Sequence, residues 1–137
     1  MVRELVHDPL FLGRKSADAG ADDLPAAADL RDTLAAHRET CVGMAGNMIG
    51  VLRRIIVFYS GDRICTMLNP KIVKTWEPYE TEEGCLSLLG GPRKTTRYRR
   101  IKVQYMTENL QARKEVFTDF TAEIIQHEVD HCSGILI

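Results

Sequence analysis

The clearest pattern of apolar and polar positions lies near the end of the chain, in residues 120–132. Two helical stripes run through this segment, one with Phe120, Ile124, His127 and His131 and the other with Ala122, Ile125, Val129 and Cys132. Residues at i and i+4 share a helix face, and a helix with apolar positions on two sides is a buried one. The pattern predicts an interior helix that begins near Thr118 and Asp119, either of which can cap it, and ends at Gly134.

A second helix is predicted near the beginning of the chain. Asp22 and Asp23 can cap it, and Pro25 suits its first turn. Its apolar face contains Ala27, Leu30 and Leu34, with His37 as a further candidate. Residues 8–21 precede this helix and mix Pro, Gly, Ser, Ala and Asp without periodicity, which predicts an irregular arm.

Strand patterns occupy the middle of the chain. They cover residues 54–59, 64–68, 71–76, 101–105 and 112–117, with turn residues between most of them. Strands joined by tight turns, with helices at either end, predict an α+β fold rather than a wound parallel sheet. We expect residues 1–137 to form one domain, since a chain of this length needs no second one.

Composition narrows the class of protein. The formal charge of −1 and the isoelectric point near 6.4 predict no general attraction to nucleic acid or to an anionic membrane. A local basic cluster at residues 93–100 fits a solvated loop and strand edge better than a phosphate site. Neither a signal peptide nor a membrane-spanning run is visible, so a cytoplasmic location is expected. The four cysteines form no CxxC pair and are expected as thiols or metal ligands rather than disulfides.

The segment His127-Glu128-Val129-Asp130-His131 carries the strongest chemical signal. On a helix its two imidazoles can bind one divalent metal, and Glu128 can reach the open side of that metal. HExxH also occurs by chance on solvated helix faces. Burying two histidines and a carboxylate is costly unless they are hydrogen-bonded or bound to metal, so the metal interpretation is favoured.

A hydrolytic site of this kind needs a third protein ligand. The extension HExxHxxGxxH is excluded, because Gly134 fits it but Ile137 stands at its last position. Cys132 lies about 100° around the helix from His131 and cannot serve. Cys85 is the better candidate, since Gly84 allows a bend that presents its thiolate and turns the backbone N–H of Leu86 into the site. A buried apolar cysteine at this position is the alternative.

Three segments together resemble the peptide deformylases. They are residues 41–50 (CVGMAGNMIG), residues 83–87 (EGCLS) and residues 126–131 (QHEVDH). The resemblance extends over roughly residues 5–137, and Asn69-Pro70 and Arg97 also fall where that family has similar residues. It implies antiparallel β-sheets around a central metal-bearing helix, with Cys85, His127 and His131 binding one Fe²⁺ per chain, and Zn²⁺ or Ni²⁺ as substitutes. It also implies removal of the formyl group from nascent polypeptides that begin with formylmethionine.

The resemblance assigns a role to further residues. The metal would activate water, Glu128 would carry its proton to the departing amine, and the Leu86 N–H would donate to the developing oxyanion. The backbone of residues 43–45 (Gly43, Met44 and Ala45) and of residues 85–87 would bind the substrate as an added strand. Ile124 and His127 would form walls of the methionine pocket. Glu83 and Arg97 are expected to support the site, with plain surface charges as the alternative. A transient association with the ribosome is expected, and no membrane or specific nucleic-acid partner.

The first of these segments departs from the family. The typical motif is GxGxAAxQ, whose glutamine donates to the oxyanion, whereas Met48 occupies that position here and has no donor. Loss of one such donor typically costs about 2.7–4 kcal/mol, so reduced activity is expected. Two other functions remain open: a non-catalytic relative that binds metal or formylated peptides, and a metalloamidase that acts on another N-acyl substrate.

Overall fold

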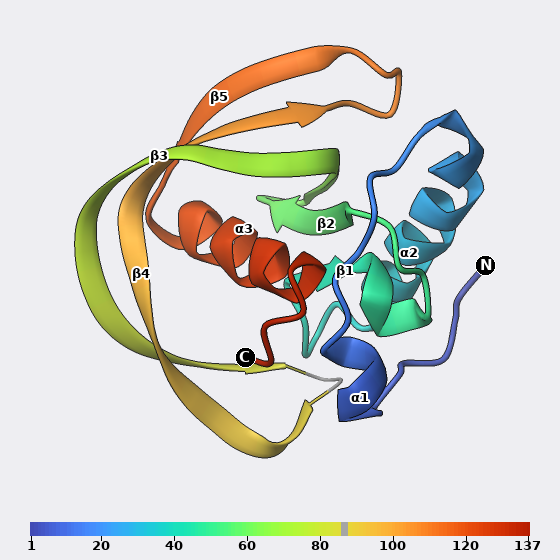
Figure 1. Ribbon diagram of the computed structural model, residues 1–137, viewed down its shortest axis with the longest axis horizontal. Helices are drawn as coiled ribbons and strands as arrows, with labels where there is room; N and C mark the ends of the chain where they lie inside the picture. Colours follow the sequence, from blue (N-terminus) through green and yellow to red (C-terminus); the bar gives the residue numbers. More distant parts are fainter. Residues whose placement is uncertain (86–87) are drawn as a thin grey trace.

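The computed structural model describes residues 1–85 and 88–137, and the side chains of residues 85–90 lie outside the description. Helices occupy both ends of the chain and strands the middle (Figure 1). In chain order the elements are α1 (Pro9–Leu12), η1 (Ala21–Asp23), α2 (Leu24–Ala36), β1 (Gly43–Ala45), η2 (Gly46–Ile49), β2 (Ile55–Ser60), β3 (Arg63–Cys85), β4 (Leu88–Met106), β5 (Ala112–Thr118) and α3 (Asp119–Cys132).

The five strands form one antiparallel sheet in the order β1-β2-β3-β4-β5. Every neighbour in the sheet is also a neighbour in sequence, so each connection is short. Strands β3 and β4 form a long curved pair that wraps around α3 (Figure 1). The predicted α+β class, with an antiparallel sheet around the helix and a helix near the N-terminus, is confirmed.

Strand β3 is longer than the sequence pattern predicted. Two runs at 64–68 and 71–76 were expected, but one strand continues from Arg63 to Cys85. The pairing with β4 shifts register between Leu68 and Lys71, where Asn69 has φ 53°, and Glu77 follows with φ 59°. Such irregularities bend a strand without ending it, because one extra residue is accommodated beside an otherwise intact ladder. The curvature around α3 therefore starts where a break was predicted.

The two faces of the sheet bury two separate clusters. Alternate residues of β2 point to opposite faces, so Ile55 and Val57 join one cluster while Ile56 and Phe58 join the other. The first cluster includes Leu30 of α2, and the second is completed by α3. Helices α2 and α3 thus cover opposite faces of the sheet. Among the described residues, no helix is long and apolar enough to cross a membrane.

The N-terminal arm is not wholly irregular, because a single helical turn, α1, forms within it. Asp8 caps this turn by accepting a hydrogen bond from the Leu10 N–H at 3.0 Å, and Pro9 occupies the first position. An Asp-Pro start is favourable for a helix, a local signal that the predicted irregular arm did not include. Before α2, Asp23 accepts from the Gly20 N–H at 2.9 Å rather than capping the helix through its side chain.

Helix α3 begins after Thr118, as predicted, although no side-chain cap hydrogen bond forms there. Its middle is fixed to β4 by Gln126, which accepts from the Tyr98 N–H at 2.9 Å and donates to the Tyr98 carbonyl at 2.8 Å. Phe120 departs from the buried stripe, with 61% of its surface exposed. It lies in the first turn, before the helix passes beneath the sheet.

Candidate active site

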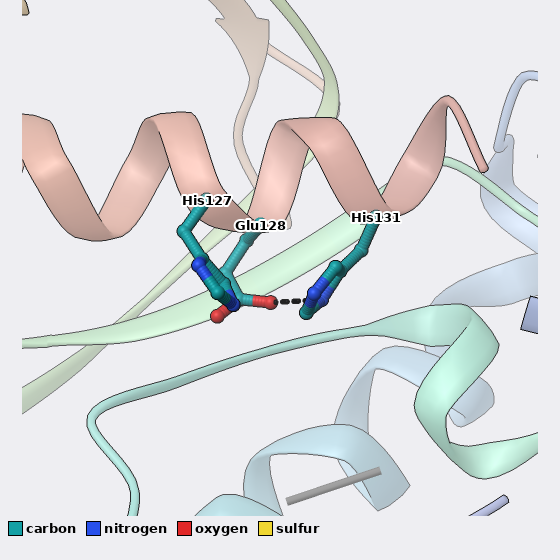
Figure 2. A group of neighbouring side chains, drawn as sticks. All are labelled: His127, Glu128 and His131. Atoms are coloured by element: carbon teal, nitrogen blue, oxygen red, sulfur yellow. Dashed lines mark hydrogen bonds and ion pairs between the residues drawn. The ribbon is translucent and has the colours of Figure 1, made fainter. Parts of the chain in front are cut away.

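His127, Glu128 and His131 project from one side of α3 and meet in a small volume (Figure 2). All three are buried, and one ligand atom from each lies within 4.8 Å of the other two. The two imidazole rings are 4.4 Å apart between centroids and inclined by 72°. The helical spacing of four residues produces this convergence, as the sequence predicted.

A buried carboxylate fixes the ring of His127. Its Nδ1 lies 2.7 Å from Oε1 of Glu83, which belongs to β3. Arg97 of β4 donates to both oxygens of Glu83 at 2.7–3.0 Å, and it also donates to Asp130 at 2.6 Å. Burial alone would raise the pKa of Glu83, but the hydrogen bonds with His127 and Arg97 lower it to about 2. Glu83 is therefore an anion at neutral pH, and it accepts from Nδ1 of His127.

His131 is held on both sides of its ring. Nδ1 lies 3.0 Å from Oε1 of Glu128, the interaction drawn as a dashed line in Figure 2, and Nε2 lies 3.1 Å from the carbonyl oxygen of Ile137. Asn47 of η2 donates to the His131 carbonyl at 2.9 Å, which ties the last turn of α3 to the segment before β2. These contacts restrict both the ring and the helix end that carries it.

The donor set fits a divalent metal. Imidazole nitrogens suit zinc and iron, and two of them from one helix face with an acidic neighbour match the arrangement of metal hydrolases. Carboxylates that accept from metal-binding histidines fix the ring orientation, which is the role of Glu83 at His127.

A cavity of about 460 Å³ opens beside these residues. Its wall comes from the segment before β1, from the end of β3 and from α3. The lining residues are Thr40, Cys41, Val42, Gly43, Met48, Glu82, Glu83, Gly84, Phe120, Glu123, Ile124, His127 and Glu128. His127 and Glu128 therefore face a space that can hold a small peptide end.

Gly43 allows α3 to approach β1 closely. A Cβ atom at this position would lie 2.7 Å from Cγ2 of Ile124 and 3.1 Å from Oε2 of Glu128. An added methyl group would overlap Ile124 and crowd the Glu128 carboxylate, so a glycine suits the close approach of α3 to β1. The backbone of β1 consequently runs directly alongside the histidine–glutamate group.

Comparison with known proteins agrees with this geometry. The family described as polypeptide deformylase matches residues 8–137. The peptide deformylase of Clostridium beijerinckii is 54% identical over 137 residues, an alignment that covers 100% of both chains. The chain belongs to the peptide deformylase family.

Solved peptide deformylases share the fold. The class I type b enzyme of Acinetobacter baumannii, in a crystal structure with Met-Ala-Ser bound, has a TM-score of 0.88 and 28% identity, covering 99% of this chain and 96% of that one. The enzyme of Thermotoga maritima has a TM-score of 0.86 and 26% identity over 99% of this chain and 95% of that one. The resemblance found in the sequence is thus confirmed. This deformylase is a hydrolase of a metal-dependent family that removes the N-terminal formyl group from polypeptides.

The structure of the deformylase site brings together most, but not all, of the residues singled out in the sequence. Gly43, Met48 and Ile124 line the cavity with His127 and Glu128. Met44 and Ala45 are fully buried in the two apolar clusters and are not among the lining residues. Their side chains serve the core, so only their backbone is left for a substrate.

Two expected residues cannot be placed. The backbone of Cys85 ends β3, just after a register shift that begins at Glu83, but its side chain lies outside the described part of the chain. Leu86 lies outside the described residues altogether. The bend expected at Gly84 takes the form of this irregularity within a strand.

Met48 occupies the place of the family's glutamine in an unexpected way. Its side chain is buried, and Sδ accepts from the Ala45 N–H at 3.4 Å. The thioether therefore provides an acceptor to the backbone of the deformylase site and, as the sequence indicated, no donor.

Several cavity residues escaped the sequence analysis, notably Glu123, Val42 and Cys41. Glu123 could have been found, because it precedes His127 by four residues and so shares its helix face. Val42 and Cys41 carried no comparable signal, since the side of a loop that faces a cavity follows from the path of the chain.

Proposed function

We propose that this chain deformylates formylmethionyl polypeptides with one divalent metal held by Cys85, His127 and His131, and with Glu128 as the proton carrier. The observation that carries the proposal is the convergence of His127, Glu128 and His131 within 4.8 Å beside the cavity. Two nitrogens on one helix face leave room for a third ligand from another element. Cys85 is our choice because it ends β3 two residues after Glu83, which already contacts His127.

The bound metal supplies Lewis-acid activation of a water molecule and of the formyl oxygen. We assign Fe²⁺ as the metal in the cell, with Zn²⁺ and Ni²⁺ as substitutes, since a thiolate and two imidazoles suit all three.

The chain's own groups move the proton and hold the geometry. Glu128 accepts the proton of the attacking water and delivers it to the amine that leaves the formyl carbon. Glu83 keeps His127 oriented, and Arg97 keeps Glu83 ionised, so both support the reaction without touching the substrate. The backbone N–H of Leu86 is our candidate donor to the oxyanion.

The substrate is proposed to bind as an extra strand along β1. Among the described strands, β1 pairs only with β2, and Gly43 brings its backbone beside Glu128. Met-Ala-Ser, the peptide bound to the Acinetobacter enzyme, has the sequence of a deformylated product. Ile124 and Met48 would form apolar walls for the methionine side chain. Because nascent chains are the substrate, we place the activity in the cytoplasm, with transient contact to the ribosome.

Met48 is expected to reduce catalytic power rather than abolish it. The oxyanion loses one side-chain donor, while the metal ligands, Glu128 and the Leu86 N–H remain. We therefore propose an active deformylase with a lower rate constant than a glutamine at this position would give.

Anaerobic turnover of formyl-Met-Ala-Ser by the iron-loaded protein tests this function. We expect deformylation by the wild type, one metal per chain, and much weaker metal binding in Cys85→Ser and His131→Ala. Cys65→Ser is the matched control, because Cys65 is a half-buried thiol of β3 outside the cavity lining. Full metal content in both ligand variants would overturn the ligand assignment, and a metal-loaded wild type without turnover would overturn the function.

A further inference from the structure

The charges of this chain are unevenly distributed over its surface. Three neighbouring segments of the sheet, residues 71–76 of β3, 100–104 of β4 and 114–118 of β5, contain five basic residues and one acidic residue, Glu115. Without these five, the chain has 13 basic against 19 acidic residues, a formal charge of −6. The overall charge of −1 therefore conceals a basic surface on a protein that is otherwise acidic.

All five cations lie on one face of the sheet. Arg100 and Lys102 alternate with Ile101, which is buried on the α3 side, so they point to the opposite side. Trp76 pairs with Arg100 and Lys74 with Lys102, while Lys71 and Lys114 both pair with Gln104. We call this surface the basic face, and it consists of Lys71, Lys74, Trp76, Arg100, Lys102 and Lys114. Only Arg100 belongs to the basic cluster at 93–100, so the sequence did not reveal this grouping.

The single acidic residue of these segments is turned away from the basic face. Glu115 pairs with Val103, which is buried on the α3 side, and it accepts from the Tyr105 hydroxyl at 2.6 Å. In the described part of the chain, none of the five cations lies within ion-pair distance of a carboxylate. The charge of the basic face is therefore not neutralised within the protein.

The basic face is also open. Helix α2 packs on the same side of the sheet only around β2, Leu68 and Met106. The cations are exposed except Lys102, which is half-buried like Trp76. No residue of the basic face lines the cavity beside α3. A ligand on this surface would leave the cavity accessible.

Two of the cations are held on the tryptophan ring. Cζ of Arg100 lies 4.7 Å and Nζ of Lys74 lies 4.9 Å from the centroid of the Trp76 ring. Such cation–π contacts hold the two head groups in place. Nucleic-acid bases stack on aromatic rings and on the planes of arginine guanidinium groups. The basic face thus combines cations for phosphates with a planar group for a base.

We propose that the basic face binds single-stranded RNA without sequence preference. Its lysines contact phosphates, and Arg100, supported by Trp76, stacks with a base. Proteins that bind single strands in this manner combine a basic surface with stacking groups. An anionic lipid surface is the less suitable partner, because membrane-surface proteins insert large apolar side chains. Val73 and Val116 are the only large apolar side chains that these described segments expose.

The experiment uses Trp76 as a local probe, because it is the only tryptophan of the chain. The metal-loaded protein is titrated with an oligouridylate of about 20 nucleotides, longer than one small domain covers. Tryptophan fluorescence reports the location of binding, and anisotropy of the end-labelled oligonucleotide gives the affinity. We expect binding at about 50 mM salt with a change in Trp76 fluorescence. The logarithm of the affinity should fall with that of the salt concentration with a slope of about −3 for four phosphate contacts.

Three variants separate charge from stacking. Lys102→Glu should lower the affinity for oligouridylate by about tenfold or more, because it removes one phosphate contact and adds repulsion. Arg100→Lys keeps the charge but loses the planar group, so it should weaken oligouridylate binding by about tenfold. The same variant should bind inorganic polyphosphate, an anion without bases, within about twofold of the wild type. Lys15→Glu is the matched control, since Lys15 is exposed outside the basic face, and it should stay close to the wild type.

Each opposite outcome overturns the proposal. No binding by the wild type at about 100 μM protein would exclude an RNA surface of ordinary strength. An equal loss of affinity in Lys15→Glu and Lys102→Glu, with both variants folded by circular dichroism, would show a general charge effect. Equal weakening of oligouridylate and polyphosphate by Arg100→Lys would exclude base stacking. Binding to vesicles that contain phosphatidylglycerol, without binding to oligouridylate, would assign the basic face to a lipid surface instead.

Discussion

Helices α2 and α3 have 13 and 14 residues, yet they bury different kinds of side chain. The buried positions of α2 are Ala27, Leu30, Thr33 and Leu34, which face one side of the sheet. Those of α3 include Gln126, His127, Glu128 and His131 beside four apolar or sulfur-containing residues. The sheet covers α2 on one side only, whereas β3 and β4 wrap around α3 (Figure 1).

This difference shows how the fold accommodates buried polar side chains. Three buried polar side chains of α3 have a partner outside the helix: Glu83 for His127, the Ile137 carbonyl for His131 and Tyr98 for Gln126. The fourth, Glu128, lies 3.0 Å from Nδ1 of His131 within the helix. Such partners offset the cost of burial, which is why α3 can carry reactive groups in the interior. Helix α2 buries one polar side chain, Thr33, which accepts from the Arg3 N–H at 2.9 Å, and its other buried positions contribute apolar packing.

Removing the proton carrier from α3 should have the largest effect. Glu128→Gln keeps the size and the burial of the side chain but cannot accept a proton, so we expect kcat for formyl-Met-Ala-Ser to fall by about 10²–10⁴-fold with metal content unchanged. Steady-state kinetics and metal analysis on the same sample measure both. Activity within a few-fold of the wild type would mean that another group acts as the base.

Replacing Glu83, which holds the ring of His127 on α3, should lower the free energy of unfolding. Glu83→Gln removes the anion between Arg97 and His127, and loss of one partner from a buried pair costs about 3–5 kcal/mol. The effect should depend on pH. The pKa of Glu83 lies below its unfolded value of 4.5, so its stabilisation is complete above pH 4.5 and is lost as pH falls toward 2.

Urea unfolding of both proteins at neutral pH and near pH 3 measures this difference. The gap in unfolding free energy between wild type and Glu83→Gln should narrow at the lower pH. An equal gap at both pH values would show that the ionised carboxylate is not the stabilising group.

A comparable change in α2 should affect stability without affecting chemistry. Leu30 is fully buried in the cluster on the α2 side of the sheet, so Leu30→Ala should cost about 2–5 kcal/mol of unfolding free energy. Under conditions where the variant is folded, kcat should match the wild type. A loss of kcat would show that packing on the α2 face of the sheet also controls the site on the α3 face.

Met48 contacts both sides of the comparison between α2 and α3. It belongs to the apolar cluster that includes α2, and it also lines the cavity beside α3. Met48→Gln should raise kcat more than it changes KM, by up to about a hundredfold, since a new donor acts on charge that develops in the transition state. The gain is limited if the amide instead replaces Sδ as the acceptor of the Ala45 N–H. A neutral or harmful effect with normal stability would show that another donor already serves the oxyanion.

Local patterns explain what could be predicted. The helix spacing of His127 and His131, the apolar stripe at Leu30 and the alternation at 101–105 are short-range features, and each appears in the structure. The extension of β3 beyond residue 76 was missed, because pairing with β4 and irregularities such as Asn69 decide it. The helical turn at Pro9 was local too, and its Asp-Pro signal was overlooked.

The sequence by itself determined the chemistry of this protein: the histidines, Glu128, the family to which the chain belongs and the loss of a donor at Met48. Tertiary structure decided which groups from other elements contact these residues. Glu83 and Arg97, which the family resemblance named as supports, and Tyr79, which no local pattern indicated, come from strands distant in sequence. The pairing of β3 with β4 and their curvature bring them to α3. Residue type and spacing along one helix are encoded locally, whereas contacts between elements depend on register and sheet twist, which arise from the whole chain.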